Sequence, residues 1–157
     1  METKTIRELT PAAQAAKLIR GILKENFPTT KFKVTSSNYS MGDSVDVKWF
    51  NGVTSEAVKK VINHFQYGHF DGMIDCYENS NTIEGLPQTK YLMCDRAISD
   101  NVVREFSNKM KTTHNELKDI SNEDLGTSFE FWGEYQNWHQ LAWRELREKE
   151  LVEAGLN

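Results

Sequence analysis

The first part of the chain changes from a helical spacing of apolar residues to strict alternation. Thr10 and Pro11 are typical of a helix start, because Thr caps free backbone N–H groups and Pro loses no hydrogen bond at the first helical position. Apolar residues then recur at helical spacing, and Pro28 ends this helix. Residues 31–35 and 44–49 alternate polar and apolar residues, which predicts two strands paired as a hairpin.

The same order of patterns follows a second time. Thr54 or Ser55 can cap a second helix that has apolar residues on one side. Residues 73–78 and 90–95 are predicted to form two further strands, and Ser99 begins a third helix. We therefore expect an α+β fold in which a small, mainly antiparallel sheet in α-β-β-α-β-β order is covered by helices.

The end of the chain, residues 128–151, is predicted to form one long helix. At about 100° per residue, one line of apolar and aromatic residues consists of Phe131, Tyr135, Trp138, Ala142 and Leu146. A second line, roughly 100° away, consists of Trp132, His139 and Trp143. One line could seal the core while the other binds a partner or a second copy of the chain, or both could pack within the domain.

Length and composition narrow the class of protein. A chain of 157 residues with eight Phe, four Trp and five Tyr can bury a core. We expect a core domain over residues 1–98 and a helical C-terminal extension over residues 99–157 packed on it. The sequence shows neither a membrane-spanning run nor an N-terminal secretory signal, and only two cysteines, Cys76 and Cys94. These features predict a soluble, cytoplasmic protein with reduced thiols.

Charge is distributed unevenly along the chain. The first 60 residues carry ten basic and six acidic side chains, and the net charge of the whole chain is −4. This balance differs from the basic footprint of a typical nucleic-acid-binding protein. An alternative function remains open, in which the basic N-terminal half binds nucleic acid through Lys31, Lys33 and Lys48.

One cluster of chemically active residues lies in the middle of the sequence. His64, His69, Asp71, Asp75 and Cys76 fall within thirteen residues, but their spacing matches no strong metal motif. We therefore favour structural roles for them and predict no catalytic residue, no bound metal and no cofactor. A metal-dependent enzyme that uses the His64/Asp71 region is kept as a second alternative.

Several segments of the chain resemble a known family. The Gly-Asp-Ser-Val sequence within residues 39–49 and the Phe-Asp-Gly sequence within residues 65–75 occur in the order and spacing of the large polyvalent protein associated domain, family twenty-nine. The resemblance covers roughly residues 12–97 and also includes residues 16–20, 27–28 and 32–34. It implies a protein of a phage or conjugative element that acts inside a bacterial cell, and it supplies no catalytic residue.

These observations together predict a non-enzymatic binding protein. Its expected role is to occlude a host protein such as a defence nuclease, as anti-restriction or anti-CRISPR proteins do. The residues expected to bind the partner are the aromatic residues of the loops and the C-terminal segment, namely Tyr39, Tyr67, Phe70, Trp132, Tyr135, Trp138 and Trp143. A homodimer through the C-terminal helix is a further expectation.

Overall fold

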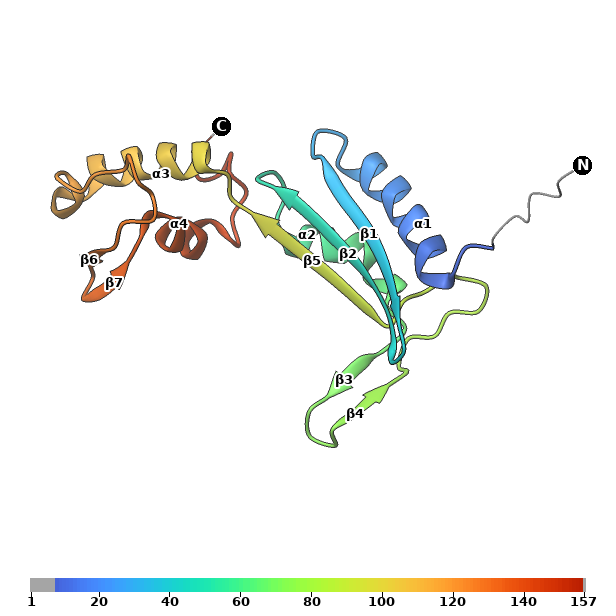
Figure 1. The fold of residues 1–157 in the computed structure, drawn as a ribbon. Coiled ribbons are helices and arrows are strands. Elements are labelled where there is room, and N and C mark those ends of the chain that lie inside the picture. Colours follow the sequence, from blue (N-terminus) through green and yellow to red (C-terminus); the bar gives the residue numbers. More distant parts are fainter. Residues whose placement is uncertain (1–7, 157) are drawn as a thin grey trace, which may run out of the picture. The chain divides into compact units, whose positions relative to one another are not determined.

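The computed structural model describes residues 8–156 and has the α+β fold class that the sequence predicts (Figure 1). The predicted absence of an N-terminal signal concerns residues 1–7, which lie outside this range. The helices and strands in chain order are α1 (Pro11–Asn26), β1 (Phe32–Tyr39), β2 (Gly42–Phe50), α2 (Ser55–Ile62), η1 (Asn63–Phe65), β3 (His69–Asp71), β4 (Cys76–Glu78), β5 (Tyr91–Ala97), α3 (Asp100–Thr113), η2 (Asn115–Leu117), β6 (Phe129–Phe131), β7 (Glu134–Gln136) and α4 (Trp138–Leu146).

The chain packs as two compact units. Of the described residues, the first unit takes in 8–28, 32–48 and 59–94, and the second takes in 29–31, 49–58 and 95–156. Strands β2 and β5 each run through both units. The predicted packing of a C-terminal extension on a core domain stays a prediction.

Helix α1 supplies the main apolar face of the first unit. The Thr10 hydroxyl accepts a hydrogen bond from the Ala13 amide (3.3 Å), so the predicted cap is present. The buried side of the helix is composed mostly of alanine, which lets it lie close to β1. Val34, Val45 and Val47 are buried on the strands.

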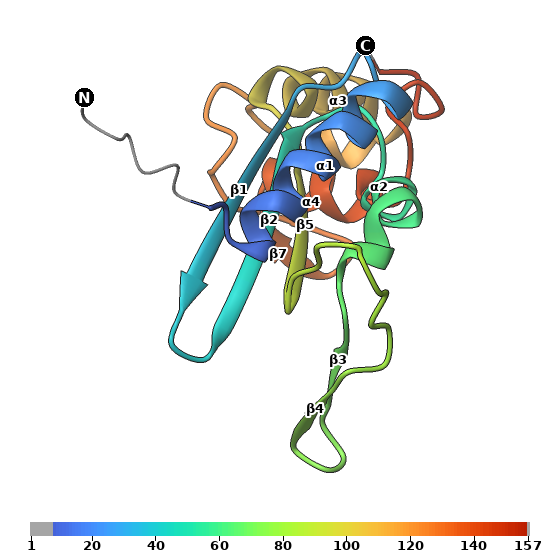
Figure 2. The same cartoon turned by 90° about the vertical axis from the view of Figure 1, so that its right-hand side faces the viewer.

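The main sheet has three strands in the order β1-β2-β5. A tight turn at residues 40–41 joins β1 to β2, so these two strands are antiparallel, whereas β2 and β5 point in the same direction in Figure 1. Helices α1 and α2 lie on one side of this sheet (Figure 2). The hydrophobic alternation of β2 therefore separates a helix-covered face from an exposed face.

The predicted strand over residues 73–78 is shorter and belongs to a separate hairpin. Strands β3 and β4 pair antiparallel, with Phe70 opposite Tyr77. The Asp71 carboxylate accepts a hydrogen bond from the Met73 amide (2.8 Å), and Asp75 has a φ of 51°, so the chain reverses inside the predicted strand. This hairpin projects from the rest of the first unit (Figure 2).

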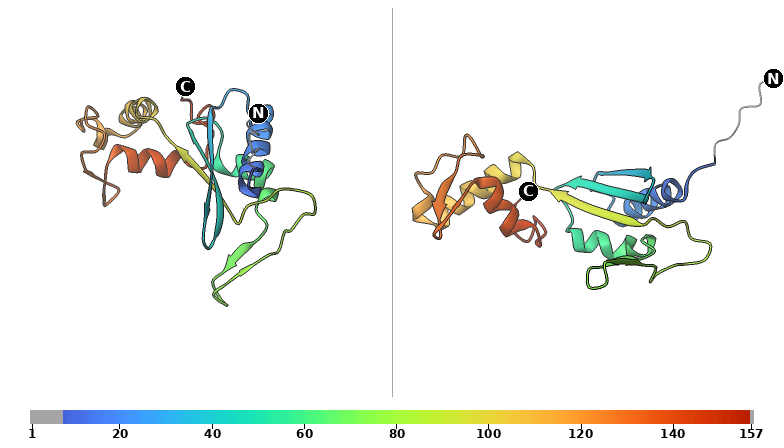
Figure 3. Two further views of the ribbon diagram at one scale, coloured as in Figure 1. Left: turned by 45° about the vertical axis from the view of Figure 1, so that its right-hand side comes forward. Right: turned by 60° about the horizontal axis from the view of Figure 1, so that its bottom comes forward.

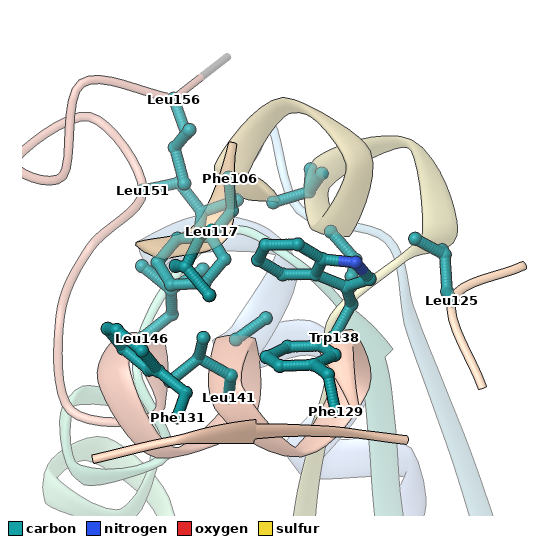
Figure 4. Packing of buried hydrophobic residues seen from close by; sticks show 13 residues of the cluster. Phe106, Leu117, Leu125, Phe129, Phe131, Trp138, Leu141, Leu146, Leu151 and Leu156 are labelled. Atoms are coloured by element: carbon teal, nitrogen blue, oxygen red, sulfur yellow. The ribbon is translucent and has the colours of Figure 1, made fainter. Parts of the chain in front are cut away.

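The second unit has its own hydrophobic core, shown in Figure 4. Side chains from α3, η2, β6, α4 and the final turns converge around Trp138, which is fully buried. The Trp138 ring lies 4.7 Å from that of Phe129, and its indole N–H donates to the Ser121 carbonyl (2.8 Å). This hydrogen bond satisfies the polar atom that burial would otherwise leave unpaired.

The prediction of one long C-terminal helix is wrong. Residues 129–136 form the β6–β7 hairpin, and α4 has only nine residues (Figure 3). Trp132 and Gly133, with φ of 54° and 75°, form the two-residue turn that ends the helical spacing. The Asn137 side chain accepts from the Gln140 amide (2.9 Å), which starts α4 with a capping box.

Candidate functional site

Trp132 is the most unusual exposed residue of the second unit. It is 58% exposed at the tip of the β6–β7 hairpin. Its left-handed backbone suits Asn or Gly in a two-residue turn and is uncommon for a bulky residue. A strained exposed aromatic residue is a reason to look for function at this position.

Neighbouring side chains hold the Trp132 indole in place. Its ring stacks on Phe131 at 4.3 Å and meets the His114 ring edge-on at 5.7 Å. The Arg144 guanidinium lies 5.5 Å from the Trp132 ring centroid and donates to the Glu134 carboxylate at 3.0 Å. Arg144 therefore connects the hairpin tip to α4, and Trp132 is presented in a fixed orientation.

Two more exposed aromatic residues lie on the same two elements. Tyr135, on β7, is 80% exposed, and Trp143, on α4, is 51% exposed with the Arg147 guanidinium 5.0 Å from its ring. We call the set Trp132, Tyr135, Trp143, Arg144 and Arg147 the aromatic surface. Aromatic and arginine side chains are the types most often found at the energetic centres of protein interfaces.

A pocket of about 480 Å³ lies beside Trp143. Ile98 and Val103 contribute apolar lining, and His139 lines it close to Asp100, with Nε2 and Oδ1 3.7 Å apart. The combination of an apolar lining and an aromatic border suits an apolar side chain of a binding partner.

Trp138 is not part of this surface. The sequence grouped it with Tyr135 as a partner-binding residue, but it is fully buried and packs against Phe129. The helical wheel failed here because the hairpin, rather than a helix, positions Tyr135. Trp138 is therefore a core residue of the second unit.

The predicted residues Tyr39 and Tyr67 belong to a cluster in the first unit. The rings of Tyr67 and Tyr77 lie 5.8 Å apart, those of Tyr77 and Tyr91 lie 5.5 Å apart, and the Lys90 ammonium is 4.9 Å from the Tyr77 ring. Burial, with the nearby Tyr67 and Tyr91, raises the pKa of Tyr77 to about 12. Burial also raises the pKa of Tyr67, and of Tyr39 beside Tyr91.

Asp43 ties this tyrosine cluster to the end of the sheet. Its carboxylate accepts from the Thr89 hydroxyl (3.0 Å) and the Lys90 amide (2.7 Å), while the Tyr77 hydroxyl donates to the Lys90 carbonyl (2.5 Å). Tyr77 and Tyr91 were not predicted from the sequence, because their contact brings together the β3–β4 hairpin and β5. Most of the polar groups here are used internally, so the cluster has a clear structural role.

Phe70 lies on the projecting β3–β4 hairpin and is 55% exposed. The sequence did not single out its neighbours Met73 and Ile74, which are 96% and 60% exposed. Acidic side chains, Asp71 and Asp75, occur in the same hairpin. The hairpin is thus a second exposed apolar surface, on a different unit from the aromatic surface.

The three lysines of the nucleic-acid alternative are all exposed. Lys33 and Lys48 belong to the first unit, whereas Lys31 belongs to the second. On β2, Lys48 shares the exposed face with Asp46, so this face carries both signs of charge. Nucleic-acid binding through these residues stays a prediction.

The structure divides the His64/Asp71 region. His64 and His69 line one pocket, whereas Asp71 caps the hairpin turn and Asp75 lies within that turn. Within residues 8–156 no group of three or more His, Cys, Asp or Glu side chains is arranged to hold a metal ion. Cys76 and Cys94 form no disulfide bond; Cys76 is exposed and Cys94 is partly buried.

Comparison with known proteins gives one match. The family model for large polyvalent protein associated domain 29 matches residues 10–107, from the cap of α1 into α3. No curated protein and no solved structure matches the chain significantly. None of the helices in the described range has the length and apolar character needed to cross a membrane. The β6–β7 hairpin and α4, which carry the aromatic surface, lie beyond the matched residues.

Proposed function

The chain belongs to the large polyvalent protein associated domain 29 family, which is typical of phage and mobile-element proteins, and we propose that it is a non-enzymatic protein that binds a host protein. The binding residues are those of the aromatic surface, in which Trp132 is the more exposed of the two tryptophans. Binding through a preformed surface needs no bond to be made or broken, so no catalytic residue is assigned.

The observation that carries this proposal is the exposure of Trp132 on a well-packed support. Three large aromatic side chains stay exposed although the unit beneath them buries a full core, including Trp138. Trp132 and Trp143 each have an arginine over the ring. Because this contact already restricts the tryptophan side chain, less conformational entropy is lost when a partner binds. A rigid aromatic anchor of this kind is what tight protein interfaces use.

Affinity capture from a bacterial lysate tests the proposal. Immobilised wild type is compared with a Trp132→Ala/Tyr135→Ala/Trp143→Ala variant, and retained proteins are identified by mass spectrometry. Phe50→Ala is the matched control, since Phe50 is an aromatic residue of the same unit that is 68% exposed outside the aromatic surface. We expect a discrete host protein that wild type and the control retain and the triple variant loses. Equal retention by all three proteins would contradict the proposal.

The finer proposal is that the host protein is a defence nuclease or one of its accessory factors. The chain is expressed in a bacterium with and without a restriction or CRISPR system, and the plating efficiency of a sensitive phage is measured. We expect plating to rise only in the defended strain and only when the aromatic surface is intact. If the chain still captures its partner but the plating efficiency does not change, the anti-defence role is refuted. The proposal of partner binding is then still supported.

A further inference from the structure

A polar pocket of about 510 Å³ lies in the first unit, where α2 and η1 meet the base of the β3–β4 hairpin. Its lining includes Lys60, Asn63, His64, His69, Ser80 and Asn81. The volume falls in the range of small-molecule sites. The aromatic surface belongs to the other unit, so this pocket is a separate feature of the chain.

The lining has a consistent chemical character. The eight described residues that form the pocket contribute ammonium, imidazole, amide and hydroxyl groups and a glycine backbone, and none of these eight is acidic or apolar. This is unexpected in a chain with 23 acidic side chains and a net charge of −4. Ammonium and imidazole groups beside neutral donors favour an anion over a cation.

Hydrogen bonds to residues of the pocket wall hold the pocket in shape. The Gln66 side chain donates to the Gly68 carbonyl (2.7 Å) and accepts from the Leu92 amide (2.8 Å). The buried Gln88 side chain donates to the carbonyls of His64 (2.7 Å) and Asn81 (2.8 Å). The segments that carry the pocket side chains are therefore fixed before any ligand arrives, which lowers the cost of binding.

Two details set the geometry at the hairpin base. A Cβ at Gly68 would lie 2.0 Å from the Glu78 carbonyl, so glycine is required for the strands to approach here. His69 Nδ1 is 3.0 Å from Ser80 Oγ, which orients the imidazole and leaves Nε2 as the ring nitrogen for a ligand. His69 and Ser80 thus act as one positioned pair at the pocket.

We propose that this polar pocket binds the phosphate group of a small phosphate-bearing molecule. A phosphate presents oxygens in several directions, which matches donors that come from α2, η1 and both arms of the hairpin base. Lys60 supplies positive charge and the Asn63 side chain can donate a hydrogen bond. When the Ser80 hydroxyl donates to His69 Nδ1, the Nε2–H of His69 is left to donate to the phosphate. The remaining volume holds the organic part of the molecule.

The test is a titration of the full-length, ¹⁵N-labelled chain followed by NMR. The probes are inorganic phosphate and adenosine monophosphate, with sodium acetate at equal ionic strength as the control. We expect saturable shifts of the His64, His69 and Asn81 amides with both phosphate probes and not with acetate. Absent shifts, or equal shifts with acetate, overturn the proposal.

Matched lysine variants make the assignment specific to the pocket. Lys60→Gln is compared with Lys59→Gln, which removes the same charge from the adjacent position of α2 outside the pocket. Losing a charge-assisted contact is expected to weaken phosphate binding about tenfold in Lys60→Gln and to leave Lys59→Gln close to wild type. His69→Gln, folded as judged by its own spectrum, is expected to show a similar loss. Equal affinity in all four proteins would show that phosphate binds elsewhere, which refutes the proposal.

Discussion

Trp132 combines two properties that rarely occur together, namely a large exposed ring and a left-handed backbone. An Asn-Gly pair would make the same turn without strain. The ring contacts with Phe131 and Arg144 offset part of that strain. The turn itself therefore does not explain why position 132 is a tryptophan. The contacts that the exposed indole can make explain it better.

Replacing Trp132 should separate stability from binding. Trp132→Asn relieves roughly 1 kcal/mol of backbone strain and loses ring contacts of about the same size. We expect its unfolding free energy in urea to stay within about 1 kcal/mol of wild type, while partner capture is lost. Phe129→Ala, at a buried position, is expected to cost about 3–5 kcal/mol. A comparable loss in Trp132→Asn would show that Trp132 serves mainly the fold.

Tyr77 makes the first unit sensitive to alkaline pH. The ordinary Tyr pKa is 10.0, and the folded chain raises that of Tyr77 to about 12. Above pH 10 the unfolded chain loses this proton while the folded chain keeps it, so the free energy of unfolding falls as pH rises through this range. Tyr77→Phe should have a shallower fall, measured by urea unfolding at several pH values. A variant slope equal to that of wild type would contradict this account of Tyr77.

Single residues were predicted from the sequence with mixed success, for identifiable reasons. The Thr10 cap and the alternation of Val45 and Val47 are local features, and the structure confirms them. The exposure of Trp132 and the burial of Trp138 depend on a turn backbone that helical periodicity does not represent. The pocket pairing of His69 with Ser80 depends on hairpin pairing across eleven positions.

Among the secondary-structure elements, the two short hairpins β3–β4 and β6–β7 were not predicted from the sequence. Residues 69–78 were predicted as a loop followed by one strand, and residues 129–136 were predicted as part of a helix. Both reversals occur at residues with positive φ, at Asp75 and at Trp132-Gly133. The Asp71-Gly72 pair, which the sequence indicates as a turn, lies at the start of the first reversal, whereas Trp132-Gly133 is not one of the Asn-Gly or Asp-Gly pairs by which short hairpins are recognised in sequences. The longer elements α1, β2 and α3 have strong periodicity and were predicted well.

Arg96, at the end of β5, joins two segments of the second unit. Its guanidinium donates to the carbonyls of Asn51 (3.1 Å) and Gly52 (2.9 Å) and, at the end of α4, to those of Leu146 (3.0 Å) and Lys149 (2.9 Å). Burial lowers the pKa of Arg96, with Glu150 acting in the opposite direction. The four carbonyls offset the cost of burying this cation.

Arg96→Lys should weaken this connection although the charge is kept. One ammonium cannot reproduce the directions of the guanidinium donors, so we expect a loss of about 2 kcal/mol in the free energy of unfolding. Arg147→Lys is the control, because Arg147 is exposed and its ring contact lies at the surface. Denaturation in urea measures both variants. If Arg96→Lys lowers the free energy of unfolding no more than Arg147→Lys does, the hydrogen bonds of Arg96 do not stabilise the second unit as proposed.

At the scale of the whole molecule, the family match and the aromatic surface cover different parts of the chain. The match ends at residue 107, whereas the aromatic surface begins at Trp132. The match supports a mobile-element context, and the exposed residues support the binding role. The family resemblance seen in the sequence could indicate the mobile-element context. It could not indicate which residues are exposed for binding, because surface exposure follows from the tertiary packing of each unit.

The expected homodimer through the C-terminal helix can be tested at the one large apolar residue that α4 leaves exposed. Trp138, Leu141 and Leu146 are buried in the second unit, so a homodimer through α4 would have to use Trp143. If that dimer forms, sedimentation of wild type at micromolar concentration gives twice the mass of Trp143→Glu. A wild type that sediments as a monomer removes the homodimer and leaves Trp143 for a host partner.

The most direct test of the binding role is photo-crosslinking inside a bacterial host. A photoreactive phenylalanine analogue is placed at position 132, 135 or 143 and, as the control, at the exposed position 50. We expect a discrete adduct with one host protein from at least one of the three positions of the aromatic surface and none from position 50. The same adduct from position 50, or no adduct from any position of the aromatic surface, would contradict it.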